Sequence, residues 1–199
     1  MNLHSPPGVT RPSWAASFRP EVAWGRFPGL LAVLLGVLSV SSPASAPPRE
    51  HEVRAAFLIN FARFVEWPSA VFEGDAPLAI GVVGDEAMAS VLELIVPGQT
   101  VGRRRLEVRR LALDDDFTGI HLLYLDPGPM EPMGEVLRPL SRHPVLVVGR
   151  HADFVGQGGM IGFVLVDRNV RFDINLRATQ AARLQISSRL LSLARTVIR

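Results

Sequence analysis

Three short, nearly uninterrupted apolar runs constrain the fold of this chain more than any other feature of its sequence. They occupy residues 78–84, 121–125 and 144–149. A strand that lacks a polar side has both faces buried, which is typical of a parallel sheet covered by helices on both sides. The sequence therefore predicts an α/β fold with three layers, in which helices flank a mainly parallel sheet.

The segments between these runs have the periods of helices and of one edge strand. Residues 86–95 carry an amphipathic pattern that Asp85 caps, and residues 132–142 carry a second one. Residues 106–113 alternate apolar and charged side chains, which indicates a half-exposed strand near an edge of the sheet. Strands and helices therefore alternate along the chain, as βαβ units require.

The first helix of the predicted domain spans residues 50–67. It ends before Pro68, because the residue that precedes a proline is pushed out of the α region. Apolar side chains recur along it at intervals of four, four and three residues, so they share one face that we expect to be buried. The side chains of this stripe are Val53, Phe57, Phe61 and Phe64.

The pattern changes near the C-terminus. Two strand-like runs, residues 160–166 and 170–176, are joined by a short polar turn and predict an antiparallel β-hairpin. Polar and apolar residues alternate along the second run, so we expect Arg171 and Asp173 on a solvent-exposed face. Residues 176–198 have a helical pattern, which we interpret as two helices.

The N-terminus has the order of a signal peptide. Residues 1–26 carry three arginines and one acid, and an apolar run of 11 residues follows. A membrane-spanning helix needs about 20 apolar residues, so this run is short for a permanent span. We expect residues 1–46 to be removed on export, after Ala44 or Ala46, which leaves residues 47–199 as a single periplasmic domain. An uncleaved anchor is the alternative.

The charge of the predicted mature chain argues against nucleic acid as a partner. The whole chain has 21 basic and 19 acidic residues, and the leader holds three and one of these, which leaves 18 of each. A domain that binds nucleic acid keeps a net positive surface outside its leader. We therefore expect no nucleic-acid partner.

The sequence lacks the common signatures of catalysis and of cofactor binding. It has no Cys, and the spacing of its five His is not that of a metal site. Gly81 and Gly84 follow a predicted strand, but neither the third glycine of a dinucleotide site nor the lysine of a phosphate loop accompanies them. We expect no enzymatic activity, no cofactor and no metal.

Three phrases of the sequence resemble one known family. They are residues 53–68, residues 157–164, and residues 171–176 with a continuation at 186–194. In order and spacing they are similar to the YfiR-like family of bacterial periplasmic regulatory proteins, over residues 50–198. The resemblance implies a non-enzymatic protein that binds and represses an inner-membrane signalling protein. In the best-known members this partner is a diguanylate cyclase, whose product is cyclic-di-GMP, and an outer-membrane lipoprotein relieves the repression.

Two sets of residues follow from this interpretation. The first is a partner-binding set of polar residues on the first helix and the hairpin: Arg54, Arg63, Glu66, Arg171 and Asp173. The second is a structural set, in which Asn175 and Ser187 cap helices and the others pack or turn the chain: Phe57, Asn60, Phe61, Phe64, Trp67, Gly158, Gly159, Asn175 and Ser187.

Two alternatives stay open at this point. One is that the protein forms a homodimer. The other is a different class of function, a periplasmic small-ligand sensor that serves a kinase or a transport system. Its crevice would lie near Gly84, Asp126 and Gly149, because open α/β sheets hold ligands at the carboxyl ends of their strands.

Overall fold

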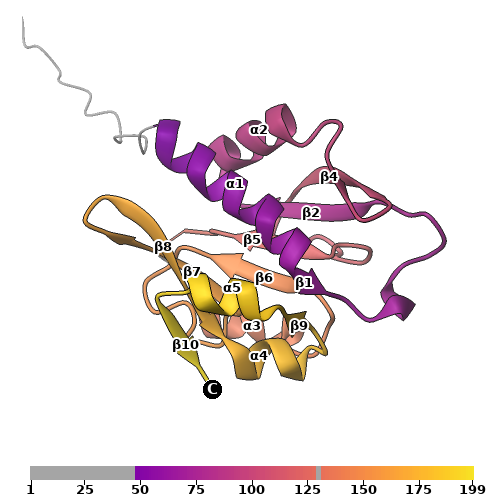
Figure 1. Ribbon diagram of the computed structural model, residues 1–199. Helices are drawn as coiled ribbons and strands as arrows, with labels where there is room; N and C mark the ends of the chain where they lie inside the picture. Colours follow the sequence, from indigo (N-terminus) through magenta and orange to yellow (C-terminus); the bar gives the residue numbers. More distant parts are fainter. Residues whose placement is uncertain (1–47, 129–130) are drawn as a thin grey trace, which may run out of the picture. The chain divides into compact units, whose positions relative to one another are not determined.

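The computed structural model describes residues 48–128 and 131–199 (Figure 1). The predicted signal peptide, residues 1–46, and its cleavage site lie outside the described residues. The helices are α1 (Pro48–Phe64), the 3-10 helix η1 (Ser69–Val71), α2 (Glu86–Ile95), α3 (Met133–Leu140), α4 (Leu176–Ala181) and α5 (Ser188–Leu193). The strands are β1 (Val65–Glu66), β2 (Leu78–Val83), β3 (Thr100–Val101), β4 (Arg104–Leu111), β5 (Leu122–Leu125), β6 (Leu146–Gly149), β7 (Ile161–Val166), β8 (Asn169–Asn175), β9 (Gln185–Ile186) and β10 (Thr196–Ile198).

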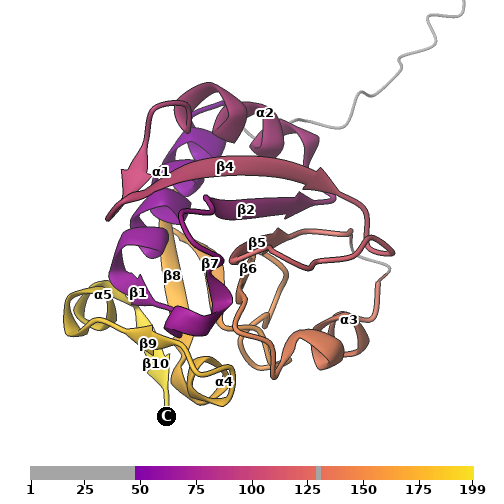
Figure 2. The ribbon, with the colours of Figure 1, turned by 90° about the vertical axis from the view of Figure 1, so that its right-hand side faces the viewer.

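A mixed sheet organises the described residues, with the strand order β10-β8-β7-β6-β5-β2-β4-β3. Strands β4, β2, β5, β6 and β7 run parallel, whereas β8 is antiparallel to β7 and β3 is antiparallel to β4. Helix α2 packs beside α1, and Figure 2 shows α1 and α5 on one side of the sheet and α3 on the other. The predicted fold class is confirmed: helices flank a mostly parallel sheet that ends in an antiparallel hairpin.

The apolar runs become the central strands of this sheet. Every residue of β2, β5 and β6 is buried, as expected for strands covered on both faces. Helix α2 has the predicted bounds, and the side chain of Asp85 caps it by accepting a hydrogen bond of 2.9 Å from the backbone N–H of Met88. Strand β4 is half-exposed near the sheet edge, because the two-residue strand β3 is its outer neighbour.

Helix α1 ends three residues earlier than predicted. Val65 and Glu66 form β1, which pairs with β9, and the backbone N–H of Ser187 donates to the carbonyl of Phe64. The predicted helical pattern of residues 176–198 is therefore wrong in part. Strand β9 separates α4 from α5, and the chain ends in β10, which runs parallel to β8. Both predicted caps are confirmed: Asn175 accepts from the N–H of Ala178, and Ser187 accepts from that of Leu190.

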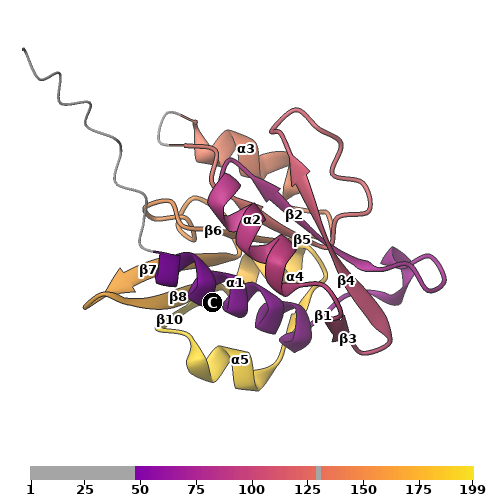
Figure 3. The ribbon, with the colours of Figure 1, turned by 90° about the horizontal axis from the view of Figure 1, so that it is seen from above.

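An aromatic cluster fixes α1 to the hairpin. The ring of Phe61 is fully buried, and its centroid lies 5.0 Å from that of Phe172 and 5.7 Å from that of Phe163. Phe57 and Phe64 are half-buried, whereas Val53 is 43% exposed, so the predicted burial of Val53 is wrong. The start of the stripe is left uncovered because the first turns of α1 lie beside the outer end of the hairpin, beyond the aromatic cluster (Figure 3).

His121 is a buried histidine that holds two strands together. Its Nδ1 accepts a hydrogen bond of 3.2 Å from the N–H of Ala79, and its ring stacks on Phe72. Nδ1 accepts only when it carries no proton, and burial lowers the pKa of His121. The unfolded chain, with a pKa near the ordinary value of about 6.5, then binds the proton more readily than the folded chain.

We therefore expect acid to destabilise the fold through His121. The stability due to the neutral ring is present above the unfolded pKa and is lost as the pH falls below it toward the folded pKa. Urea unfolding at pH 7.5 and 5.5 should give a loss of stability that is larger for wild type than for His121→Asn, whose amide oxygen still accepts from Ala79. Equal losses in the two proteins would show that His121 does not titrate on unfolding.

Candidate functional site

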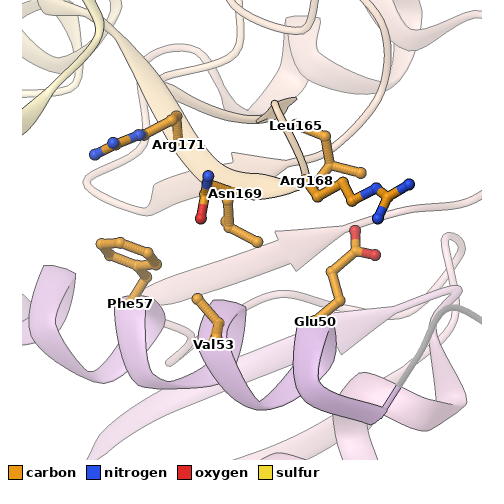
Figure 4. Close-up of a pocket in the computed structure, with 8 residues that line it drawn as sticks. Glu50, Val53, Phe57, Leu165, Arg168, Asn169 and Arg171 are labelled. Carbon is orange, nitrogen blue, oxygen red and sulfur yellow. The ribbon is translucent and has the colours of Figure 1, made fainter.

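A groove of about 790 Å³ opens between the first turns of α1 and the outer end of the β7–β8 hairpin (Figure 4). Helix α1 contributes one wall and the hairpin contributes the other. The residues that line it are Glu50, Val53, Phe57, Leu165, Arg168, Asn169, Val170 and Arg171. We call this feature the α1–hairpin groove.

The groove has an apolar centre and a charged rim. Val53 is 43% exposed and Leu165 is 54% exposed, although both are large hydrophobic residues. Glu50 lies on the α1 wall, and Figure 4 shows Arg168 reaching toward it from the hairpin. Exposed apolar side chains with a polar rim that contains arginine are typical of surfaces that bind another protein.

Local geometry explains why these side chains are left uncovered. Asp167 and Arg168 have φ angles of 49° and 62°, as the two central residues of a type I′ turn do, so the hairpin closes tightly and keeps its strand pairing to the tip. Phe163 and Leu165 are two residues apart on β7 and share a face. The rings of Phe57 and Phe61 cover Phe163, but Leu165 lies beyond them.

One of the five predicted partner-binding residues, Arg171, lies in this groove, where it is exposed. Arg63 and Glu66 are exposed as expected, but they lie at the other end of α1 and beyond it. The side chain of Arg63 donates a hydrogen bond of 2.8 Å to that of Gln99. The structure therefore does not bring these residues together with Arg171.

The predicted exposure of Arg54 and Asp173 is wrong. Arg54 is 4% exposed, because it lies on the inward side of α1, where its Nη2 pairs with Glu50. Asp173 is 5% exposed, because β10 runs alongside it and Arg195 donates to its carboxylate. Neither side chain is available to a protein partner on the surface.

The structural residues of the family phrases have identifiable contacts. Trp67 is half-buried, and its Nε1 donates a hydrogen bond of 3.1 Å to the carbonyl of His121. Gly158 has a φ of +105°, and a Cβ on Gly159 would lie 2.2 Å from the ring of Phe154. Asn175 also donates to the carbonyl of Val155. Asn60 is half-buried.

Other residues of the groove were not predicted from the sequence. They are Glu50, Val53, Leu165, Arg168, Asn169 and Val170. A partial signal for Leu165 was present, because it lies in the predicted hairpin and shares a strand face with Phe163. The sequence alone does not tell where along the hairpin α1 lies, and this position decides which residues stay exposed.

The described residues offer little for metal-dependent chemistry or for spanning a membrane. Within residues 48–128 and 131–199, no three His, Cys, Asp or Glu side chains come together in a way that would hold a metal ion. No helix in the same two ranges is both long enough and apolar enough to cross a bilayer. The exposed apolar centre and the charged rim make the α1–hairpin groove our candidate functional site, as a surface for a partner.

Comparisons with known proteins identify relatives of this chain. A family model described as YfiR/HmsC-like matches residues 51–195. A solved structure, described as a conserved domain protein from Vibrio cholerae O1 biovar El Tor, has a similar fold, with a TM-score of 0.50 at 12% sequence identity. The match covers 74% of this chain and 60% of that one, so this chain spans less than two thirds of its length. No curated protein matches.

Proposed function

This chain belongs to the YfiR/HmsC-like family, and from that membership we propose that it is a non-enzymatic periplasmic protein that binds and represses a membrane signalling protein. The observation that carries the proposal furthest is the α1–hairpin groove, with its exposed Val53 and Leu165. The family match supports a regulatory role, because its known members regulate diguanylate cyclases from the periplasm. We propose that the groove receives the partner.

We propose that the partner is an inner-membrane diguanylate cyclase with a periplasmic region. The rim of the groove contains Glu50 and two arginines, Arg168 and Arg171, so an apolar segment flanked by acidic residues would complement it. Release of the partner, by an outer-membrane lipoprotein, would raise cyclic-di-GMP. Self-association would use the same apolar surface, so a homodimer is a competing occupant.

A photo-cross-linking amino acid placed in the groove tests this proposal in living cells. We would incorporate it at Leu165, and at Leu94 as a control, because Leu94 is 82% exposed on α2 and lies outside the groove. Mass spectrometry should identify, at Leu165 alone, an inner-membrane protein with a cyclase domain. A cross-link from Leu165 only to a second copy of the chain, or to a transporter, would contradict the proposed partner.

We expect Arg171→Ala to weaken repression without weakening the fold. Arg171 is exposed on β8, and surface substitutions of this kind change stability by about 0.5 kcal/mol or less. The variant should melt within a few degrees of wild type, and cyclic-di-GMP in its cells should rise. Arg177→Ala, at an exposed position on α4 away from the groove, is the matched control and should leave cyclic-di-GMP unchanged. Equal effects of the two substitutions would exclude a specific role of Arg171.

A further inference from the structure

The outer part of strand β8 has a neighbouring strand on only one side. Residues 169–174 pair with β7, whereas β10 pairs with residues 173–175 alone. Figure 1 shows the outer end of the β7–β8 hairpin projecting beyond β10. Within residues 48–128 and 131–199, no strand lies beside residues 169–171 of β8 on the side away from β7, so these residues form an uncovered edge of the sheet.

The backbone of Val170 directs its hydrogen-bonding groups out of this edge. Successive residues of an antiparallel strand turn their N–H and carbonyl groups alternately to one side and to the other. The N–H of Asn175 donates to the carbonyl of Met160, on the β7 side. The carbonyl of Phe172 accepts from the N–H of Arg195, on the β10 side. Val170 is two residues from Phe172, so its N–H and carbonyl also face outward, where β10 does not reach.

A second uncovered edge, on β4, differs in its side chains. Strand β3 pairs with residues 104–105 alone and leaves the rest of the outer edge of β4 without a strand. That part of β4 carries Glu107, Arg109 and Arg110, and all three form ion pairs. Charged side chains are a common means of keeping a sheet edge from pairing with another chain. The edge of β8 instead presents the backbone of an apolar residue, Val170, beside the α1–hairpin groove.

Val170 joins this edge to the α1–hairpin groove. Its side chain shares a strand face with that of Phe172, whose ring centroid lies 5.4 Å from that of Phe57 on α1. The side of β8 that faces α1 is therefore the side on which Val170 lines the groove. A strand added beside Val170 would place every second side chain on this face, against Val170 and the half-buried Phe57.

We propose that the partner of the α1–hairpin groove adds an extended segment to the outer edge of β8, with main-chain hydrogen bonds to the N–H and carbonyl of Val170. This inference rests on the proposed function, since it describes how the same partner is held. In complexes of this kind the main-chain bonds supply affinity, and alternate side chains in pockets supply specificity.

Charge favours a partner segment with acidic residues over a second copy of this chain. The hairpin tip and the uncovered edge contain Asp167, Arg168 and Arg171, an excess of positive charge. Pairing this edge with the same edge of a second copy would bring the arginines of both tips together, and like charges across a strand pair are destabilising. An acidic side chain of a different protein would pair with these arginines at the rim of the groove.

Amide hydrogen exchange, followed by NMR on the exported form of the chain, tests the proposal. The probe is the purified periplasmic region of the membrane protein that cross-links to Leu165. In the free protein, the N–H of Val170 should exchange at least about tenfold faster than that of Arg171, which faces β7. The probe should slow exchange at Val170 by at least about tenfold and leave exchange at Leu94, on α2, unchanged.

Two substitutions at Val170 separate the backbone from the side chain. Proline removes the outward N–H and keeps the hydrogen bonds to β7, and edge strands accept proline at such positions. Calorimetry should show that Val170→Pro lowers the affinity for the probe by about tenfold or more. Val170→Ile, which keeps the N–H and a β-branched apolar side chain, should bind within about threefold of wild type. If a thermal melt shows that Val170→Pro is unfolded, exchange in the wild type decides the question.

The outcomes distinguish this inference from the proposed function. Binding of the probe without slower exchange at Val170, or equal binding by Val170→Pro and Val170→Ile, would overturn strand addition and leave the groove as a surface that binds through side chains. The absence of a cross-linked membrane protein, or of any binding by it, would overturn both. Slow exchange at Val170 in the free protein would contradict the inference alone, because the edge would then be covered before the partner arrives.

Discussion

Replacing Phe61 with alanine is expected to lower the free energy of unfolding by about 3 to 5 kcal/mol. The side chain is fully buried, and its ring lies within 6 Å of those of Phe57, Phe163 and Phe172, so truncation leaves a cavity between α1 and the hairpin. A domain of this size has a total stability of about 5 to 15 kcal/mol, so the variant should be largely unfolded or degraded in cells. Urea unfolding of the purified protein measures the loss.

Val53→Ala is the matched control for this prediction. Both residues belong to the apolar stripe of α1, but Val53 is 43% exposed whereas Phe61 has no exposed surface. The control should change the free energy of unfolding by less than about 1 kcal/mol, since alanine also favours the helix. A loss at Val53 as large as the loss at Phe61 would mean that the first turns of α1 are more deeply covered than the structure indicates.

Leu165→Asp is expected to abolish partner binding and to leave the fold intact. Leu165 is 54% exposed in the centre of the α1–hairpin groove. A bound partner would remove the new carboxylate from water against apolar side chains, and the carboxylate would repel the acidic residues proposed to flank the partner's apolar segment, so the affinity should fall by at least about thirtyfold. Calorimetry with the purified periplasmic region of the cross-linked membrane protein measures this loss, and a thermal melt of the free variant confirms that it is folded.

The exposed leucine of α2 provides the control for this charge substitution. Leu94 is 82% exposed, so Leu94→Asp adds the same charge to the same protein outside the groove. Its affinity for the partner should equal that of wild type. If the two aspartate variants bind equally well, the partner uses a different surface, and the exposed residues at the far end of α1, Arg63 and Glu66, become the next candidates.

Elements whose burial is encoded locally could be predicted from the sequence. The runs that became β2, β5 and β6 have no polar side, and a strand of this kind is stable only when helices cover both of its faces. The helix caps at Asp85, Asn175 and Ser187 were also predictable, because each cap depends only on a backbone N–H three residues further along the chain.

Elements that depend on distant partners could not be predicted in this way. Strand β10 contains Val197, which also fits a helical period, and it is a strand because β8 offers a free edge beside it. Arg54 was expected at the surface because charged residues usually are, but it lies on the inward side of α1, where its side chain is buried and pairs with Glu50. The position of α1 along the hairpin likewise decided which groove residues are exposed.

Cellular cyclic-di-GMP is the quantity that tests the central claim most directly. It should be measured in the wild type, in a strain that lacks the gene, and in that strain after the gene is restored as wild type or as Leu165→Asp. Repression through the α1–hairpin groove predicts that deletion raises cyclic-di-GMP, that the wild-type gene returns it to the original level, and that the folded Leu165→Asp protein does not. An unchanged level of cyclic-di-GMP after deletion would contradict the claim.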